Sequence, residues 1–307
     1  MTAAAPAPAA GWQALPANSR AAVWMLLAVL AFSVNNVSLK SLTRTLDPLQ
    51  IMFVRGVIMT ALLLPIAWRT RALATTRFGG HLTRSVLGTS GAYLFILALS
   101  LAPVADVVAL SFSRALFIVV MAVLILGEAV GWRRWTACAV GFIGVLVMVR
   151  PGFGSLNLGL VAAATDAILS AGVALTLKSL GRTERPQTIV FYFGLLSTLF
   201  SMVPALLVWR DPGANGWALL ALTGVLATCG QFAITRAWTE GEASIVAPLA
   251  YVQLVLSGGL AYLLFRETPD TLGLLGAAII VASTLYIALR EARLKKAAVG
   301  PAAAPTR

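Results

Sequence analysis

Residues 98–128 read ALSLAPVADVVALSFSRALFIVVMAVLILGE, and residues 237–267 read AWTEGEASIVAPLAYVQLVLSGGLAYLLFRE. The two stretches align without a gap, and six of 31 positions are identical. A second pair agrees more closely, because SLKSLTRTLDP at 38–48 matches TLKSLGRTERP at 176–186 at seven of 11 positions. In both pairs, the second stretch follows the first by almost the same number of residues. The chain therefore consists of two copies of one half-length unit.

The composition is that of a membrane protein. Of the 307 residues, 59% are hydrophobic and 11% are charged, and the mean hydropathy is +0.89. The chain holds ten runs that are apolar on every side, each close to the length of about 20 residues that crosses ~30 Å of hydrocarbon as a helix. Their predicted ranges are 21–39, 48–68, 85–101, 106–126, 135–149, 157–177, 189–208, 217–235, 243–264 and 272–289.

Each half contains five of these spans, which is an odd number, so the two halves enter the bilayer from opposite sides. We therefore predict an all-α membrane protein with ten transmembrane helices, built as two inverted five-helix repeats. The repeats are expected at 20–150 and 151–290, between a disordered cytoplasmic tail at 1–19 and a basic cytoplasmic tail at 291–307. This architecture is typical of secondary transporters.

The net charge of +12 reflects membrane topology rather than a surface for nucleic acid. If the N-terminus is inside, 16 lysines and arginines fall on the inner side and five on the outer side, which leaves Arg55 and Arg114 within spans. Basic residues collect in cytoplasmic connections. We therefore expect both termini in the cytoplasm, a lipid bilayer as the partner, and no nucleic acid.

No group of residues indicates catalysis, a metal site or a cofactor. His81 is the single histidine, and we expect it in a basic connection without an acid or a cysteine beside it. The two cysteines, Cys138 and Cys229, fall inside spans, where cysteine behaves as a small hydrophobic residue. We expect no enzyme, no metal and no cofactor.

Three ionisable residues lie well inside predicted spans: Arg55, Arg114 and Asp166. A charge at membrane depth costs roughly 2.5–3.5 kcal/mol, so each needs a reason to be there. All three lie about seven to nine residues from the predicted outer ends of their spans, which places them in one layer ~10–14 Å deep, together with Tyr93. Two positive groups and one negative group predict a site for an anionic or zwitterionic metabolite. The alternative, that Asp166 pairs with an arginine and only fastens helices, stays open.

The duplication adds further candidates for the same site. Arg114 aligns with Gln253, and Phe112 aligns with Tyr251. Polar residues related by a repeat suggest a cavity shared between the two halves. Asn36, near the outer end of the first span, is another candidate for lining this cavity. Packing for Tyr251, and an interhelical hydrogen bond for Asn36, are the alternatives.

The repeats resemble the drug/metabolite transporter superfamily, and within it the EamA-type carriers with ten spans. The resemblance rests on FVRG at 53–56, on LSLAPVADVVALSFSRALFIVVMAVLILGEAVGWRRWTACAVGFIGVLVMVRPG at 99–152, and on EASIVAPLAYVQLVLSGGLAYLLFRETPDTLGLLGAAIIVASTLYI at 242–287. It implies ten helices around a central cavity, and alternating access that moves a small metabolite, commonly outward.

The fourth span departs from the pattern of that family. A proline often follows the Ser-Phe pair there, whereas this chain continues from Phe112 with Ser113 and Arg114. In the ninth span, Ala250 stands where related sequences often carry an acid. A gained arginine and a missing acid favour a substrate with a carboxylate over an organic cation.

We therefore predict a secondary transporter of the bacterial inner membrane that exports a small amino-acid-like or other carboxylate-bearing metabolite. The predicted substrate-binding residues are Arg55, Arg114, Asp166, Tyr93, Tyr251, Gln253 and Asn36. An exporter of cationic or amphipathic drugs is the second hypothesis, and a channel or lipid-handling membrane protein is a third, from a different class. Two questions stay open: whether a proton or another ion is coupled, and whether the protein is a monomer or a weak homodimer.

Overall fold

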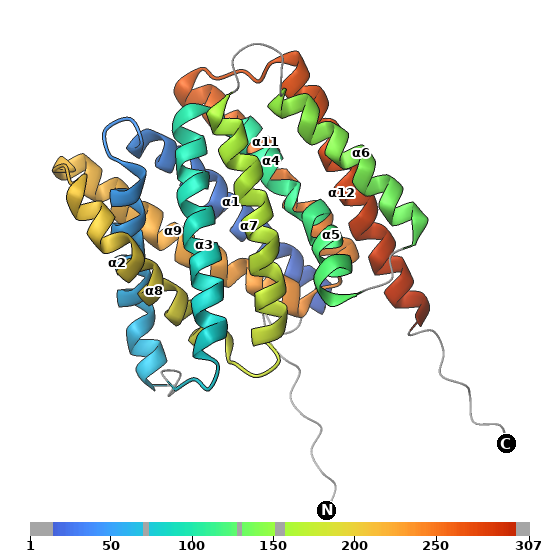
Figure 1. Ribbon diagram of the computed structural model, residues 1–307, viewed down its shortest axis with the longest axis horizontal. Helices are drawn as coiled ribbons and strands as arrows, with labels where there is room; N and C mark the ends of the chain where they lie inside the picture. The colour runs from blue at the N-terminus through green and yellow to red at the C-terminus, as the bar shows by residue number, and fades with distance from the viewer. Residues whose placement is uncertain (1–14, 70–73, 128–130, 151–156, 299–307) are drawn as a thin grey trace, which may run out of the picture.

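The computed structural model describes residues 15–69, 74–127, 131–150 and 157–298 (Figure 1). Every regular element in these ranges is a helix, and ten stretches are long and apolar enough to cross a membrane. The predicted all-α class with ten spans is confirmed. The helices are α1 (Ala17–Leu42), α2 (Pro48–Arg69), α3 (Phe78–Leu101), α4 (Val104–Phe112), α5 (Arg114–Leu126), α6 (Trp132–Val149), α7 (Leu158–Leu180), α8 (Pro186–Leu207), α9 (Gly213–Glu240), α10 (Ala243–Ala250), α11 (Val252–Phe265) and α12 (Thr271–Ala298).

Two of the ten spans are interrupted. The fourth span consists of α4 and α5, which part at Ser113, and the ninth consists of α10 and α11, which part at Tyr251. The sequence predicted the spans at 106–126 and 243–264 but not the interruptions within them, each of which is one residue that keeps right-handed helical dihedral angles. Because the two spans are equivalent in the duplication, the two interruptions fall at matching places in the two repeats.

The two interruptions share one hydrogen-bond pattern but lie in different sequence contexts. In the ninth span, Pro248 has no amide hydrogen and crowds the preceding turn, and the Tyr251 amide donates to the Pro248 carbonyl only three residues back, at 3.2 Å. The fourth span has no proline. There the Ser113 hydroxyl donates to the Leu110 carbonyl at 2.6 Å, and the Ser113 amide donates to the same oxygen at 2.9 Å. A serine that bonds back in this way competes with the helical ladder and bends the helix.

The third span begins seven residues earlier than predicted, at Phe78. Its first turns hold His81 and Arg84, whose polarity hides the helix from a hydropathy pattern. Both side chains are buried against α8: the His81 ring stacks on Tyr192 with centroids 4.7 Å apart, and the Arg84 guanidinium lies 3.9 Å from the centroid of Phe193. The expectation that His81 lies in a connection is therefore wrong, because aromatic rings cover it inside the bundle.

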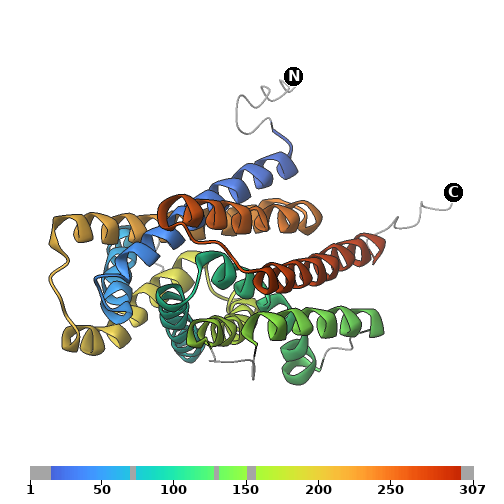
Figure 2. The ribbon, with the colours of Figure 1, turned by 90° about the horizontal axis from the view of Figure 1, so that it is seen from above.

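The helices pair between the two halves of the chain. The most extensive pairings join α1 with α9, α2 with α8, α3 with α7, and α6 with α12. Figures 1 and 2 both show α6 and α12 running side by side. The α1–α9 and α3–α7 pairs are equivalent, because each joins the first span of one half to the third span of the other. The repeats therefore interlock in one bundle, and α1 begins at the same end of it as α12 finishes (Figure 1).

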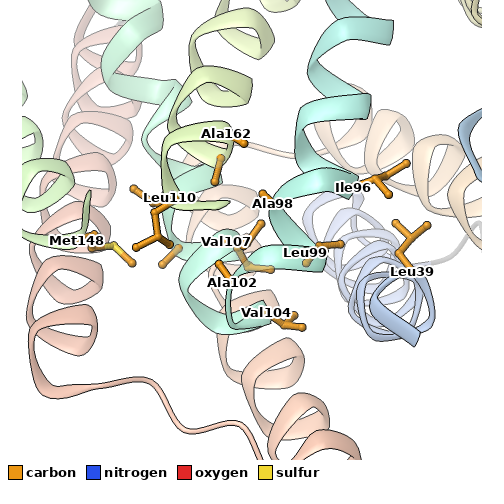
Figure 3. Close-up of a cluster of buried hydrophobic side chains, with 14 of the residues drawn as sticks. Leu39, Ile96, Ala98, Leu99, Ala102, Val104, Val107, Leu110, Met148 and Ala162 are labelled. Carbon is orange, nitrogen blue, oxygen red and sulfur yellow. The ribbon is translucent and has the colours of Figure 1, made fainter. Parts of the chain in front are cut away.

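The main hydrophobic core surrounds the turn between α3 and α4. Figure 3 shows Leu99 of α3, Val107 and Leu110 of α4, and Met148 of α6 gathered there. Each of these side chains is at most 1% exposed. Lipid tails are as apolar as these side chains, so close van der Waals packing rather than removal from water favours the contact. The core therefore fixes the first half of the interrupted fourth span in the middle of the bundle.

The predicted tails lie only partly within the structure. Helix α1 begins at Ala17, and the rest of the predicted tail at 1–14 lies outside the described residues. At the other end, α12 continues past the predicted span to Ala298, and 299–307 lie outside the described residues.

Replacing Gly276 of α12 with alanine is expected to lower the melting temperature. A Cβ there would lie 2.4 Å from Met148 Cγ and 2.8 Å from the Gly144 carbonyl oxygen, so α6 and α12 would have to separate. Overpacking costs about 1–3 kcal/mol, which corresponds to a fall of about 3–10 °C. Gly259→Ala is the control, since a Cβ there meets nothing within 4 Å. Thermal unfolding in detergent measures both, and equal melting temperatures would contradict the close approach.

Candidate functional site

Three of the predicted site residues come together where the interrupted spans meet. Arg114 begins α5, Asp166 lies in α7, and Tyr251 separates α10 from α11. The Arg114 guanidinium acts electrostatically on both the Asp166 carboxylate and the Tyr251 hydroxyl. These three residues, from three spans and both repeats, form what we call the central group.

Arg114 is the exposed member of the central group, although it lies in the middle of a span. Within the described part of the chain it makes no ion pair within 4.0 Å and no hydrogen bond through its side chain. A guanidinium can form two parallel bonds to one carboxylate. Arg114 is therefore an uncommitted cation whose donors are available to an anion.

Asp166 is the buried member, with 7% of its surface exposed. Its Oδ1 accepts a hydrogen bond from the Ser170 hydroxyl at 3.1 Å. The same oxygen lies against Gly91 of α3, where a Cβ would come within 2.8 Å of it. The glycine therefore makes the room that the carboxylate occupies between α3 and α7. The two charges interact without a direct ion pair, because Asp166 is not within 4.0 Å of the Arg114 nitrogen atoms.

Tyr251 connects the central group to the aromatic residue that the duplication pairs with it. Its ring lies 4.6 Å from the ring of Phe112, centroid to centroid, at an interplanar angle of 32°. Its hydroxyl donates to Thr284 Oγ1 of α12 at 2.6 Å. The two repeat-related rings thus touch at the point where both spans are interrupted, and α12 holds one of them in place.

The other four predicted residues are not joined to the central group by any hydrogen bond, ion pair or ring contact in the described ranges. Arg55 lies on α2, and its Nε is buried without a hydrogen-bond partner. Asn36 of α1 is 2% exposed, and its Nδ2 also has no partner. Gln253 is half-buried in the first turn of α11, and Tyr93 of α3 packs against the main hydrophobic core.

A buried polar stripe on α3 was not predicted. It consists of His81, Arg84, Ser85 and Thr89, none more than 6% exposed, and each has a buried polar atom without a hydrogen-bond partner. Their spacing of three, one and four residues puts them on one face of the helix. This helical spacing could have been recognised in the sequence, because it begins at His81, before the predicted start of the span.

One end of the bundle is fastened by two ion pairs, and we call it the Lys40 end. Lys40 of α1 pairs with Glu267, which follows α11. Glu267 also accepts from the Val104 amide at 3.1 Å, so it fixes the start of α4. Arg150, at the end of α6, pairs with Asp270, and its hydrogen bond holds the pKa of Asp270 below the usual value.

The opposite end has polar contacts of its own. Arg20 of α1 pairs with Glu240 of α9 at 3.1 Å. The Thr75 hydroxyl donates to Glu184 at 2.7 Å, which ties the connection before α3 to the connection before α8. The central group therefore lies between two ends that are each fastened by contacts between the repeats.

Comparison with known proteins matches both repeats to one family. The family described as "EamA-like transporter family" matches at residues 19–150 and again at 157–289. An S-adenosylmethionine uptake transporter of Rickettsia prowazekii (strain Madrid E) is 32% identical over 270 residues, which cover 87% of this chain and 92% of the relative. A riboflavin transporter of Vibrio cholerae serotype O1 is 33% identical over 279 residues, with coverage of 89% and 94%.

Two further comparisons agree with these. A pseudopaline exporter of Pseudomonas aeruginosa is 32% identical over 273 residues, which cover 86% of this chain and 95% of the exporter. A crystal structure of another protein has a TM-score of 0.63 at 20% identity, and covers 91% of this chain and 99% of its own. At that identity the structural likeness shows the fold alone.

Replacing Glu267 with glutamine is expected to destabilise the Lys40 end. Lys40 would lose its counter-charge, and the two side chains are only 12% and 21% exposed. Leaving one charge of such a pair uncompensated costs about 1–3 kcal/mol. The double variant Lys40→Met/Glu267→Gln should be more stable than the sum of the single variants predicts, because no unpaired charge remains. Thermal unfolding of all four proteins measures this, and strictly additive losses would contradict the pairing.

Proposed function

The chain belongs to the EamA-like transporter family, and we propose that it moves a small amino-acid-like or other carboxylate-bearing metabolite across the bacterial inner membrane by alternating access. The observation that carries this proposal is the central group, in which an exposed cation lies near a buried carboxylate at the interruption of two spans. One positive and one negative group match the carboxylate and the ammonium of an amino acid.

The interruptions support a substrate site at this depth. Discontinuous helices of transporters commonly form the substrate site near the middle of the bilayer. The interruptions at Ser113 and Tyr251 occur in spans four and nine, which are equivalent in the duplication, and the first of them directly precedes Arg114. A guanidinium in hydrocarbon costs several kcal/mol, which favours an aqueous cavity around Arg114 over contact with lipid.

Within this site, we assign the Arg114 guanidinium to the substrate carboxylate and Asp166 to its ammonium group. Tyr251 supplies an aromatic face for the remainder of the substrate. Tyr93, Gln253 and Asn36 are proposed to line the same cavity, on the strength of their depth and of the repeat. Arg55 is proposed as a second cation, and its unpartnered Nε supports that role.

The names of the relatives bear on the substrate and on the direction. S-adenosylmethionine, which the Rickettsia relative takes up, carries an α-carboxylate and an ammonium group, as the proposal requires. Another relative is named as a riboflavin transporter, a protein whose ligand belongs to a different chemical class. We propose outward transport. The relatives include uptake proteins as well as an exporter, so flux in oriented vesicles decides the direction.

The distribution of basic residues supports an orientation with both termini in the cytoplasm, and hence with the Lys40 end toward the periplasm. Sixteen lysines and arginines then fall on the cytoplasmic side and five on the periplasmic side.

Counterflow in proteoliposomes tests the transport proposal. Vesicles preloaded with unlabelled amino acids and organic acids should accumulate one labelled member of the pool saturably. Arg114→Ala should reduce the rate by about tenfold or more, because a charge-assisted bond to the carboxylate is lost. Arg133→Ala is the control, since that arginine is exposed beside Trp132 at the start of α6.

Three outcomes would contradict the proposal. Flux that never saturates would indicate a channel. Uptake of cationic compounds alone, abolished by Asp166→Asn, would support the hypothesis of a drug exporter. Wild-type rates in both Arg114→Ala and Asp166→Asn would remove the central group from transport.

Cysteine labelling in intact cells tests the orientation. In a Cys229→Ser background, which leaves only the buried Cys138, a membrane-impermeant maleimide should modify Asp211→Cys and spare Thr183→Cys. These two positions lie at opposite ends of the bundle, beside α9 and after α7. The reverse pattern would place the termini outside the cytoplasm.

A further inference from the structure

A pocket of about 640 Å³ lies at the Lys40 end of the bundle, and its volume is within the range of about 300–1,000 Å³ found for small-molecule sites. Helices α3, α4, α6, α7 and α12 contribute to it. Leu101, Met148, Leu158 and Leu160 give it apolar walls, and Asp106 is among its polar residues. Asp106 lies in the first turn of α4, about 12 Å along the span from Arg114, so this pocket is separate from the central group.

Asp106 is the buried carboxylate of this pocket, and it has no hydrogen-bond or ion-pair partner in the described part of the chain. Its side chain lines the cavity although the residue is only 7% exposed. Gly273 of α12 makes room for it, because a Cβ there would lie 2.8 Å from the Asp106 Oδ1 and 2.7 Å from the Asp270 Oδ1. A buried carboxylate in this position is costly without a counter-charge.

The neighbouring charges do not supply that counter-charge. Four charged groups act on Asp106: the cations Lys40 and Arg150, and the carboxylates Glu267 and Asp270. Each cation already has its own carboxylate, since Lys40 pairs with Glu267 and Arg150 pairs with Asp270. Of these five groups, Asp106 is therefore the one left unneutralised. The cluster lacks one positive charge, and the pocket is the open space beside it.

We propose that this pocket is a second binding site, which takes a small organic ammonium ion. The N–H groups of the ion would donate to the Asp106 carboxylate, and its hydrocarbon part would lie against Leu101, Met148 and Leu158. A bare metal ion fits less well, because it prefers several oxygen ligands around one point. The described residues hold no cluster of three or more histidines, cysteines and acids that would provide them.

The site does not depend on the substrate assigned to the central group. Its ligand is a cation that meets a carboxylate at one end of the bundle, whereas Arg114 in the middle of the span selects for an anionic group. A negative counterflow experiment would therefore not contradict the ammonium site. A failure to bind an ammonium ion at Asp106 would equally not contradict the transport proposal.

Calorimetric binding of n-hexylammonium to the purified full-length protein in detergent tests the proposal. The wild type should bind the ion saturably, and Asp106→Asn should bind it at least about tenfold more weakly, because the neutral amide keeps the shape but loses the charge. Asp211→Asn is the matched control, since Asp211 is an exposed carboxylate at the same end of the bundle and outside the pocket. Hexanoate, of equal chain length and opposite charge, should not bind at this site.

A second variant keeps the proposal testable if the Asp106→Asn protein does not fold. Gly273→Ala keeps the carboxylate but pushes on it, and should also weaken hexylammonium binding. No saturable binding to the wild type would overturn the proposal. So would equal affinity in wild type, Asp106→Asn and Gly273→Ala, or a loss of binding in Asp166→Asn that Asp106→Asn does not share, which would put the ion at the central group.

Discussion

The structure depends on one constraint: hydrocarbon offers no hydrogen-bond partner, so each backbone amide and carbonyl must find one within the protein. Continuous helices satisfy this constraint along eight of the ten spans. At Ser113 and Tyr251 the chain satisfies it with tighter bonds, because each amide donates to a carbonyl only three residues back. The rings of Phe112 and Tyr251 lie 4.6 Å apart. The two interruptions therefore lie next to each other, at the place where Arg114 and Tyr251 are found.

The central group requires both repeats. Arg114 comes from the first, and Asp166 and Tyr251 come from the second. They approach one another because the strongest helix pairings cross between the repeats, so α7 lies on α3 rather than beside its own neighbours in sequence. Close contact needs small residues at the crossing, and Gly91 has that role beneath the Asp166 carboxylate. A single repeat would carry some of the polar residues but could not assemble the group.

The sequence predicted what depends on local composition and missed what depends on contacts. Ten spans and their duplication follow from hydropathy and self-similarity, and Arg114 and Asp166 stood out because charge inside a span is costly. The start of α3 was missed because Tyr192 and Phe193, far away in the sequence, cover His81 and Arg84. The interruption at Ser113 was missed because a hydroxyl that bonds back to its own helix leaves no mark on hydropathy. Pro248 can be seen in the sequence, but a proline alone does not predict that the interruption falls at Tyr251.

The interrupted fourth span carries charges of opposite sign on its two halves, and both halves are anchored in the main core. Asp106 lies at the start of α4, which the buried Val107 and Leu110 anchor in the main core and which Glu267 caps at the Val104 amide. Arg114 begins α5, on the other side of Ser113. Leu116 and Val119 of α5 are at most 1% exposed and belong to the same main core as Val107 and Leu110, so α5 is anchored as α4 is. A rearrangement that carried Arg114 from one side of the membrane to the other would therefore involve the whole fourth span, together with the core and the ion pair that hold it.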